Sequence, residues 1–455
     1  MRALLINSTL LLVLATALGT AGCAGNRQYR TSFEPANISA FGPGTADAVI
    51  EVAPNYKLGF VEFDDQGWFW NPKQKNAVEQ MIRKDADIGQ PNSVGVIMVV
   101  FVHGWKNNAA FGNSNIATFQ AALQKLSEVE LALCQKENRQ PRKVVGIYAG
   151  WRGLSESIEP FKELSFWGRK AAAQRVGGYG AMTELLMDLE SLQKASNDSR
   201  PTNLPPSKLV IVGHSFGADA VYNAISQIVT ERFVDTIKQE KGQLLKPLGD
   251  QVILLNPAFE AARLYDLKQL ARSVETYSPE QRPVVSILTS DGDWATHYVF
   301  PVGQTIGTVF QSHRSGLQKS ANHEAVGWFE PFVTHELHYA PRAAHAPSSG
   351  HPPDAMVGKL MLRSPDKLPG AAENILAQRQ KWRAESAPEE INYFGDCVLI
   401  SNGNYRPHDP ILVISVDKQI MKDHNDIGNT VLLNFLQEYI PFCENDTSVA
   451  VGGVK

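Results

Sequence analysis

Apolar positions along the chain form short continuous runs that alternate with longer segments of helical spacing. The runs that predict strands are residues 57–63, 94–102, 144–149, 209–212, 252–255, 284–288 and 411–416. From residue 94 on, these runs are continuously apolar, which is typical of strands buried on both faces of a parallel sheet. The segments that predict helices are residues 75–84, 117–135, 171–194, 218–237 and 429–439. This alternation predicts an α/β fold, with a mostly parallel sheet and helices on both of its faces.

The same pattern predicts one large domain rather than several. The chain of 455 residues is long, since an average domain has about 150 residues, but single α/β domains often exceed that length. We expect this domain at residues 57–455, with a helical insertion near residues 154–200 and a second insertion at residues 341–396. The second insertion opens with the segment PRAAHAPSSGHPP and is largely polar. We interpret it as an insertion or cap on the sheet and not as a separate fold.

The N-terminal residues 1–22 have the features of a signal peptide. Arg2 is followed by an apolar run at residues 10–18 and by small residues up to Cys23. The run is too short for a membrane span, which needs about 20 apolar residues. The site resembles the cleavage site of a bacterial lipoprotein, although Thr20 stands where Leu is usual. The resemblance implies an exported protein with a lipid on Cys23, anchored to a bacterial membrane on the periplasmic or outer face; a secreted soluble protein is the alternative.

Residues 23–56 are polar at first and punctuated by Gly and Pro, so we expect a lipidated N-terminus and a tether there. Besides Cys23, the chain has three cysteines. In an oxidising compartment Cys397 and Cys443 could form a disulfide, whereas Cys134 is expected to be a small buried apolar residue. The sequence leaves the pairing open.

Charge and cysteine usage exclude several function classes. The chain has 43 Lys and Arg against 47 Asp and Glu, a net charge of −4, and lacks any block rich in Lys and Arg. A nucleic-acid partner is therefore not expected. The sequence also lacks a CxxC pair, which argues against structural zinc and thioredoxin-like chemistry.

Residues 213–217 read Gly-His-Ser-Phe-Gly, a G-x-S-x-G motif directly between a predicted strand and a predicted helix. The bare motif is weak evidence, but its context is specific. A tight strand-to-helix turn forces Ser215 into a strained backbone conformation, and flanking glycines are needed because a Cβ would collide with the neighbouring elements. The Ser215 hydroxyl would then stand at a helix N-terminus, which favours developing negative charge.

With this motif in this context, the sequence resembles the α/β-hydrolase family over about residues 57–440, apart from residues 341–396. The resemblance implies an oxyanion-hole loop after the strand at residues 94–102, where the sequence continues His-Gly-Trp. The implied oxyanion donors are the backbone N–H groups of Trp105 and Phe216. His103 is then expected to brace the loop.

The chain order of the family is Ser, acid, His, which implies an acid after the strand at residues 284–288. Asp291 and Asp293 both lie in that turn. The usual spacing, with a small residue three positions before the acid, favours Asp293, and Asp291 is the alternative acid that would otherwise cap or brace the turn. Glu260 is a more distant third, one strand earlier.

His424 is the implied general base, because it lies after the last predicted strand and before the last predicted helix. His408 precedes that strand and would lie at its wrong end. Four other histidines fall in or next to the insertion and are expected to be solvated or locally bonded loop residues: His335, His338, His345 and His351. The segment HELH at residues 335–338 lacks the spacing of a zinc-protease motif, so neither a metal nor a cofactor is expected.

Together these residues imply a serine hydrolase that cleaves a carboxylic ester of a small molecule or a lipid through an acyl-enzyme. Two alternatives stay open: an acyltransferase with the same residues, and a non-catalytic lipoprotein on a hydrolase fold. The oligomeric state also stays open. Aromatic residues near strand ends could form an apolar substrate pocket or could be ordinary rim and core residues: Trp105, Trp151, Phe216 and Trp294. The segments at residues 150–153 and 166–170 resemble one bacterial branch of the family.

Overall fold

The computed structural model describes residues 26–39, 47–90, 93–154, 161–201, 204–238, 244–245, 248–341, 370–384 and 391–443. Its strands are β1 (Ala36–Asn37), β2 (Ile50–Val52), β3 (Tyr56–Glu62), β4 (Val96–Val102), β5 (Lys143–Gly150), β6 (Lys208–His214), β7 (Gln251–Leu255), β8 (Val285–Ser290), β9 (His335–Tyr339), β10 (Ile391–Phe394), β11 (Cys397–Ser401) and β12 (Ile411–Val416). Its helices are α2 (Pro72–Asp85), α3 (Ser114–Glu137), α4 (Phe161–Gly178), α5 (Ala181–Asp198), α6 (Phe216–Lys238), α7 (Ala261–Ser273), α8 (Phe300–Gly307), α9 (Gly316–His323), α11 (Ala371–Arg383) and α12 (Thr430–Phe442), with a π-helical turn η1 (Ala295–Val299) and a 3₁₀ turn η2 (Glu330–Phe332).

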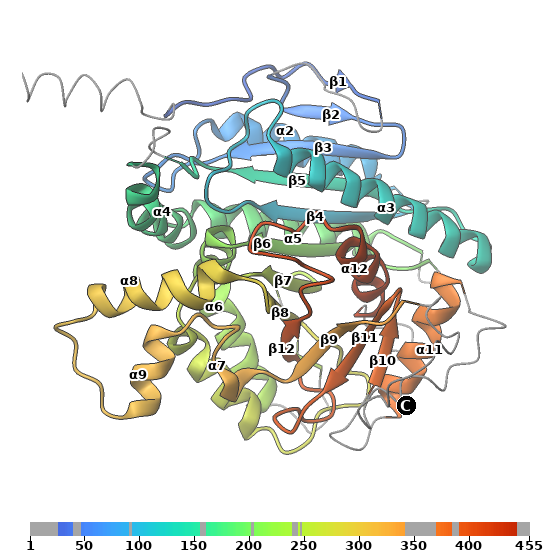
Figure 1. Cartoon of the computed structure of the whole chain (residues 1–455). Helices are drawn as coiled ribbons and strands as arrows, with labels where there is room; N and C mark the ends of the chain where they lie inside the picture. The colour runs from blue at the N-terminus through green and yellow to red at the C-terminus, as the bar shows by residue number, and fades with distance from the viewer. Residues whose placement is uncertain are drawn as a thin grey trace, which may run out of the picture.

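Within these described residues the strands form one 12-stranded sheet in the order β1-β2-β3-β5-β4-β6-β7-β8-β12-β9-β11-β10 (Figure 1). The strands from β3 to β9 in this order run parallel. The two ends differ from this pattern, because β2 pairs antiparallel with β3, and β11 pairs antiparallel with β9 and β10. The predicted α/β fold with a mostly parallel sheet is thus confirmed.

Two apolar cores cover the two faces of the sheet. In β4, Val96, Met98, Val100 and Val102 point into the core formed with α2 and α4 to α7, and the intervening residues point into the core formed with α3, α11 and α12. Every residue of β4 is therefore buried. Burial on both faces explains why the central strands are continuously apolar in the sequence.

The predicted helix at residues 171–194 is wrong as a single element. The chain forms α4 and α5 instead, with a break at Gly180, whose φ is +104°. Close packing accompanies the break, since a Cβ on Gly177 would lie 2.1 Å from the carbonyl oxygen of Ala220 in α6. Gly180 thus supplies the positive φ at the break, and Gly177 supplies the close contact with α6.

The predicted tether at residues 23–56 needs correction. Its described part adds β1 and β2 to one edge of the sheet. Arg30 is 1% exposed, donates to Glu51 at 2.8 Å and stacks over the Phe60 ring at 3.7 Å. These contacts make the described part of the segment a component of the folded domain. Residues 1–25, including Cys23 and the predicted signal peptide, lie outside the described residues.

The predicted insertion at residues 341–396 is described only in part. Its described residues include α11 and β10, and β10 forms the other edge of the sheet by pairing with β11. Trp382 of α11 is fully buried, and its indole N–H donates to the carbonyl of Gln281 at 2.7 Å. This part of the segment therefore packs on the sheet.

The disulfide that the sequence allows between Cys397 and Cys443 is not formed. Both residues and Cys134 are buried free thiols. Separately, none of the helices within the described ranges combines the length and the apolar character needed to cross a bilayer.

Candidate active site

Ser215 occupies a sharp turn between the end of β6 and the start of α6. Its φ is +56°, in the left-handed region that a residue other than glycine rarely adopts. A Cβ on Gly213 would lie 2.7 Å from the Cα of Ala218, and a Cβ on Gly217 would lie 2.1 Å from the carbonyl oxygen of Val102. Only glycine fits at both flanking positions, so the motif folds as a strained strand-to-helix turn that presents the serine.

The structure brings together Ser215, His424 and Asp293, which come from three distant segments. The Nε2 atom of His424 lies 2.7 Å from Ser215 Oγ, and its Nδ1 atom lies 2.9 Å from both carboxylate oxygens of Asp293. An ionised carboxylate only accepts, so Nδ1 carries the proton and donates it to Asp293. The Nε2 lone pair therefore faces the serine hydroxyl, the tautomer that a general base needs.

Asp293 is held by further donors. It is 1% exposed and accepts the backbone N–H of Thr296 at 3.0 Å and the Thr296 hydroxyl at 2.5 Å. The indole N–H of Trp328 donates to the same Thr296 oxygen at 2.9 Å. Burial acts to raise the pKa of Asp293, but His424 and the Thr296 hydrogen bonds outweigh it, and the pKa is lowered. The carboxylate thus stays ionised beside the imidazole.

The two alternative acids have other partners. Asp291 lies in the same turn but is exposed, and it accepts the hydroxyl of Ser415 at 2.5 Å. Glu260 forms an ion pair with Lys170 and accepts from Gln304. Asp293, and neither alternative, is the acid that contacts His424.

Two residues that the sequence did not single out hold the backbone of His424. The Nε2 atom of His214 lies 2.8 Å from the His424 carbonyl oxygen, and the side-chain amide of Asn256 donates to the same oxygen at 3.0 Å. The amide oxygen of Asn256 accepts the backbone N–H of Ser290 at 2.9 Å. Asn256 thereby links the ends of β7 and β8 to the His424 loop, and Asn256 follows β7 with a φ of +44°.

His214 is suited to this role because it stays neutral. Burial, followed by the neighbouring His424, lowers the pKa of His214 to about 3. A carbonyl only accepts, so Nε2 of His214 is the donor to His424. A neutral ring 5.3 Å from the His424 ring holds the loop without placing a second positive charge beside the base.

The loop after β4 lies against the serine. A Cβ on Gly104 would lie 2.7 Å from the Cβ of Ser215, so a glycine is required for this approach. His103 is fully buried and braces the loop: its Nε2 accepts the backbone N–H of Trp151 at 3.0 Å, and its Nδ1 donates to the Gly104 carbonyl at 2.9 Å. Burial lowers the pKa of His103 to about 4, so it is neutral. Trp105 follows directly in the chain.

A pocket of about 540 Å³ opens over Ser215 and His424. Of the aromatic residues considered from sequence, Trp105 and Trp294 line it. Trp151 and Phe216 are buried in the core instead, 3% and 0% exposed. The apolar part of the remaining lining is Ala258 after β7 and Ala295, Val299 and Phe300 in and after η1, and the polar part is Lys106, Thr296 and Asn425.

The prediction of a loop is wrong for His335 and His338, because both lie in β9. His335 is buried and not solvated, but it is bonded locally, with its Nδ1 atom 3.0 Å from the Thr334 hydroxyl. Its ring packs edge-on against Tyr405 with centroids 4.5 Å apart, and burial lowers the pKa of His335 to about 3. His338 is more exposed and contacts Glu336 at 3.0 Å. His408 is buried before β12, while His345 and His351 lie outside the described residues.

In the described segments, groups of three or more His, Cys, Asp or Glu side chains able to hold a metal ion are absent. Comparisons of the chain with family models, with curated proteins and with solved structures gave no match.

Proposed function

We propose that the protein is a serine hydrolase of the α/β-hydrolase type that cleaves a carboxylic ester through an acyl-enzyme. The observation that carries the proposal is the continuous hydrogen-bonded series from Asp293 through His424 to Ser215, with the serine on a strained turn at a helix N-terminus. A nucleophile, a base in the required tautomer and an acid that orients the base are the parts of this chemistry.

In the first half of the reaction, Ser215 Oγ attacks the ester carbonyl and His424 Nε2 takes its proton. The carbonyl oxygen becomes an oxyanion, which the backbone N–H groups of Trp105 and Phe216 stabilise. One such donor is worth about 3–4 kcal/mol in related chemistry. The intermediate collapses as His424 returns the proton to the leaving alcohol, and the acyl group stays on Ser215.

In the second half, water replaces the alcohol. His424 takes a proton from the water as its oxygen attacks the acyl carbon, a second oxyanion forms, and the proton returns to Ser215 Oγ as the carboxylic acid leaves. Asp293 holds the imidazolium that forms transiently in each half.

The lining of the pocket supports an apolar acyl or alcohol group in the substrate. Trp105, Trp294, Val299 and Phe300 surround the opening above the serine. Such a lining suits an ester of a small molecule or a lipid with an apolar group, and Lys106 is the charged residue of the lining.

Hydrolysis of esters with increasing acyl length tests the proposal. The wild type should turn over at least part of the series, Ser215→Ala should lose the activity, and Ser191→Ala, which removes a more exposed serine on α5, should keep it. A folded wild type without activity on the series, or equal activity in Ser215→Ala, would contradict the proposal.

Adding an acceptor alcohol to the same assay separates hydrolysis from acyl transfer, since transfer yields a new ester.

We also propose that Cys23 carries a lipid that anchors the exported protein to a membrane. The support is the sequence before Cys23, which has a basic residue, a short apolar run and small residues. Wild type expressed in a bacterium should partition with membranes and carry a lipid-sized mass increase on the N-terminal peptide. Cys23→Ser should lose the added mass; an unchanged mass in the wild type would refute the anchor.

A further inference from the structure

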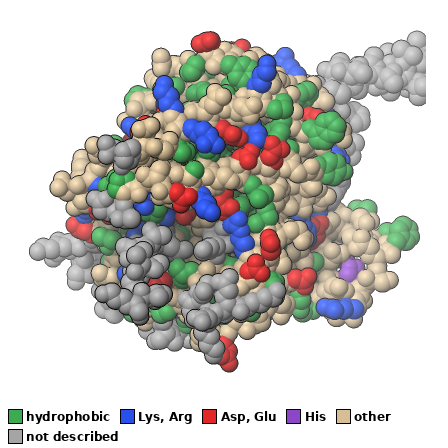
Figure 2. Space-filling model, turned by 180° about the vertical axis from the view of Figure 1, so that it is seen from behind, with side chains coloured by type: hydrophobic (Ala, Val, Ile, Leu, Met, Phe, Trp, Pro, Cys, Tyr) green, Lys and Arg blue, Asp and Glu red, His purple; other side chains and the backbone are tan. Residues whose placement is uncertain are grey.

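A helical arm formed by η1, α8, α9 and their connections, residues 294–323, carries an unusual amount of exposed apolar surface. Among the described residues, seven of the fifteen exposed large apolar side chains lie in this arm: Trp294, Tyr298, Val302, Ile306, Val309, Phe310 and Leu317. Phe310 is 99% exposed. The arm projects from the body of the molecule beside the sheet (Figure 1), and apolar side chains gather at its outer end (Figure 2).

Five of the seven exposed residues form a stripe along the arm. Trp294, Tyr298, Val302 and Ile306 follow one another at four-residue intervals through η1 and α8, and Phe310 continues the interval beyond the helix. Positions spaced by four lie on one helix face. The opposite face is the packed one: Phe300 and Gln304 of α8 and Ala321 of α9 are buried, and α9 packs on α7 and α8.

The charge of the arm is as distinctive as its apolar stripe. Residues 294–323 contain no Asp or Glu, although the whole chain has 47. The charged side chains of the arm are Arg314 and Lys319, and both are exposed. An apolar stripe with basic residues beside it is the composition of a segment that lies in the interface of an anionic bilayer. Trp294 and Tyr298 are the aromatic types that prefer this interface.

We propose that the α8–α9 arm docks on the surface of a lipid bilayer that contains anionic headgroups, inserting the stripe that ends at Phe310. The shape favours a bilayer over a second copy of the chain, because a narrow projecting tip offers little area for a protein interface. A symmetric dimer through the arm would also bring Arg314 and Lys319 of one copy toward those of the other, whereas anionic headgroups complement them.

The stripe begins at the mouth of the candidate active site. Trp294 belongs both to the stripe and to the pocket lining over Ser215, and Val299 lines the pocket one turn along. Docking would therefore hold the pocket next to the bilayer. If the proposed hydrolase function holds, the substrate class that follows is an ester that partitions into membranes.

Hydrogen–deuterium exchange of the full chain with vesicles tests the docking surface. The readout must be local, because a lipid on Cys23 would by itself retain the protein on vesicles. Vesicles of phosphatidylcholine with phosphatidylglycerol should slow exchange in peptides covering residues 298–318, and vesicles of phosphatidylcholine alone should do so less.

Paired variants make the test specific. Phe310→Ser combined with Ile306→Ser should raise the lipid concentration needed for protection by about tenfold or more. Met187→Ser combined with Leu131→Ser removes exposed apolar side chains on α5 and α3 and should change nothing. Unchanged exchange in the arm of vesicle-bound wild type would overturn the proposal, and so would arm protection that grows with protein concentration without vesicles. Labelling with a soluble fluorophosphonate tests the hydrolase proposal separately. If Ser215 is labelled while the arm is not protected, only the docking proposal fails.

Discussion

At the scale of single residues, the turn after β8 places two aspartates two positions apart in opposite environments. Asp293 is buried against His424 and Thr296, whereas Asp291 points to solvent and accepts from Ser415. The difference follows from the turn itself: a Cβ on Gly292 would lie 2.0 Å from the carbonyl oxygen of Lys422, so the turn packs tightly on the His424 loop. Asp291 is therefore a suitable control for substitutions of Asp293, because both carboxylates lie in the same turn.

Asp293→Asn should lower kcat of ester hydrolysis by about 10³–10⁴-fold, because an amide can donate to Nδ1 and favour the wrong imidazole tautomer. Asp291→Asn should leave kcat within about twofold, since the residue is exposed and the amide oxygen of Asn can still accept the Ser415 hydroxyl. Steady-state kinetics on one ester checks both variants. A larger loss in Asp291→Asn than in Asp293→Asn would reverse the assignment of the acid.

Thr296 is a positioning residue that acts through Asp293. Thr296→Val keeps the shape of the side chain but removes the hydroxyl that donates to Asp293 and accepts from Trp328. We expect kcat to fall about tenfold, which corresponds to about 1.4 kcal/mol for one lost hydrogen bond to a charged group, while KM stays nearly constant. A rise in KM at constant kcat would instead indicate a role in substrate binding.

The G-x-S-x-G motif between a predicted strand and a predicted helix indicated Ser215, and the resemblance to the α/β-hydrolase family then implied Asp293 and His424 through its chain order. The apolar pattern located the strands after which these residues lie, and strand ends meet at one edge of a parallel sheet. It did not reveal the residues that hold them, namely His214, Asn256, Thr296 and Trp328. Their partners come from segments far apart in the chain, and short-range spacing carries no signal of such contacts. A polar residue directly after a buried strand, as with Asn256, is the one hint that was present.

At the scale of elements, the turn between β6 and α6 depends on close backbone packing at Gly217. Gly217→Ala would place a Cβ 2.1 Å from the Val102 carbonyl oxygen. It should prevent folding or destabilise the protein by several kcal/mol, since an ordinary overpacked core substitution already costs about 1–3 kcal/mol. Gly168→Ala is the matched control, since a Cβ there meets nothing within 4 Å in α4. It should stabilise the protein by about 0.5–1 kcal/mol. Chemical denaturation measures both, and a harmless Gly217→Ala would contradict the packing of the turn.

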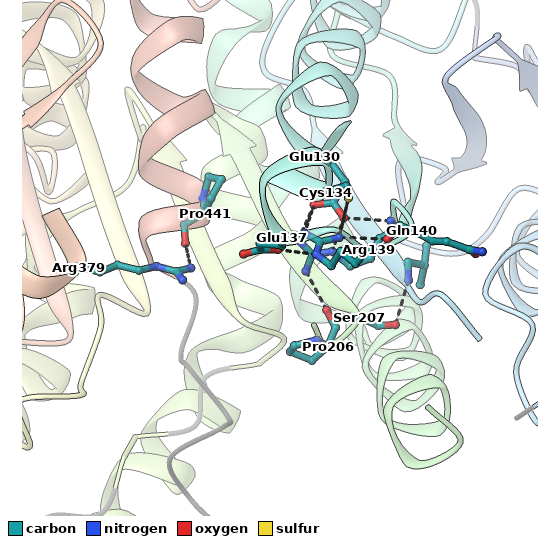
Figure 3. A network of polar contacts seen from close by, with 11 residues as sticks. Glu130, Cys134, Glu137, Arg139, Gln140, Pro206, Ser207, Arg379 and Pro441 are labelled. Carbon is teal, nitrogen blue, oxygen red and sulfur yellow. Dashed lines mark hydrogen bonds and ion pairs between the residues drawn. The ribbon is translucent and has the colours of Figure 1, made fainter. Parts of the chain in front are cut away.

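A buried ionic network fixes the end of α3 (Figure 3). The carboxylate of Glu130 accepts from Arg139 at 2.7 Å and from Arg142 at 2.8 Å, and Arg142 also donates to the Pro206 carbonyl at 2.9 Å. These contacts connect α3 with the start of β5 and the segment before β6. Burial acts to raise the pKa of Glu130, but the two arginines outweigh it and lower the pKa to about 2.

This lowered pKa makes stability depend on pH. Since the folded pKa is about 2 and the ordinary value is 4.5, the stability from ionised Glu130 is complete above pH 4.5 and is lost as the pH falls toward 2. The loss amounts to about 3 kcal/mol. Denaturation of Glu130→Gln should show a lower free energy of unfolding at neutral pH and a weaker dependence between pH 4.5 and 2 than wild type. Glu137→Gln, whose carboxylate is half-exposed, should follow the wild-type curve; identical curves for all three would contradict the account.

The elements predicted correctly are those with the strongest burial. The central strands are apolar on both faces, and α3, α6 and α12 have helical spacing within a few residues of their observed bounds. The strands missed lie toward the two ends of the sheet, β1, β2 and β9 to β11. β1 and β2 have two and three residues, and β9 and β10 mix polar with apolar residues, as in HELHY of β9. β11 is buried throughout, so this reason does not apply to it.

At the scale of the whole molecule, the sheet combines segments that the sequence assigned to different parts. The described residues before 57 extend one edge, and described residues of the 341–396 segment extend the other. Composition alone suggested a tether and an insertion, since both segments are rich in polar, Gly or Pro residues. Both segments nevertheless bury side chains against the sheet, among them Arg30 and Trp382, which composition does not reveal.

In the arm of residues 294–323, the apolar pattern alone does not indicate which residues are buried. Its apolar residues have the spacing of a buried helix face, yet they are exposed, because the packed face of α8 uses Phe300 and Gln304 instead. A periodic pattern identifies an apolar helix face. It does not show whether solvent, protein or lipid covers that face.

The central claim is that Ser215 is a nucleophile activated by His424 and Asp293. The most direct measurement is reaction of the folded full chain with a fluorophosphonate, followed by mass spectrometry of its peptides. The account predicts one modification, on the peptide that contains Ser215, with labelling absent in Ser215→Ala and strongly slowed in Asp293→Asn. A folded wild type that is not modified, or a Ser215→Ala variant that is modified equally, would contradict it.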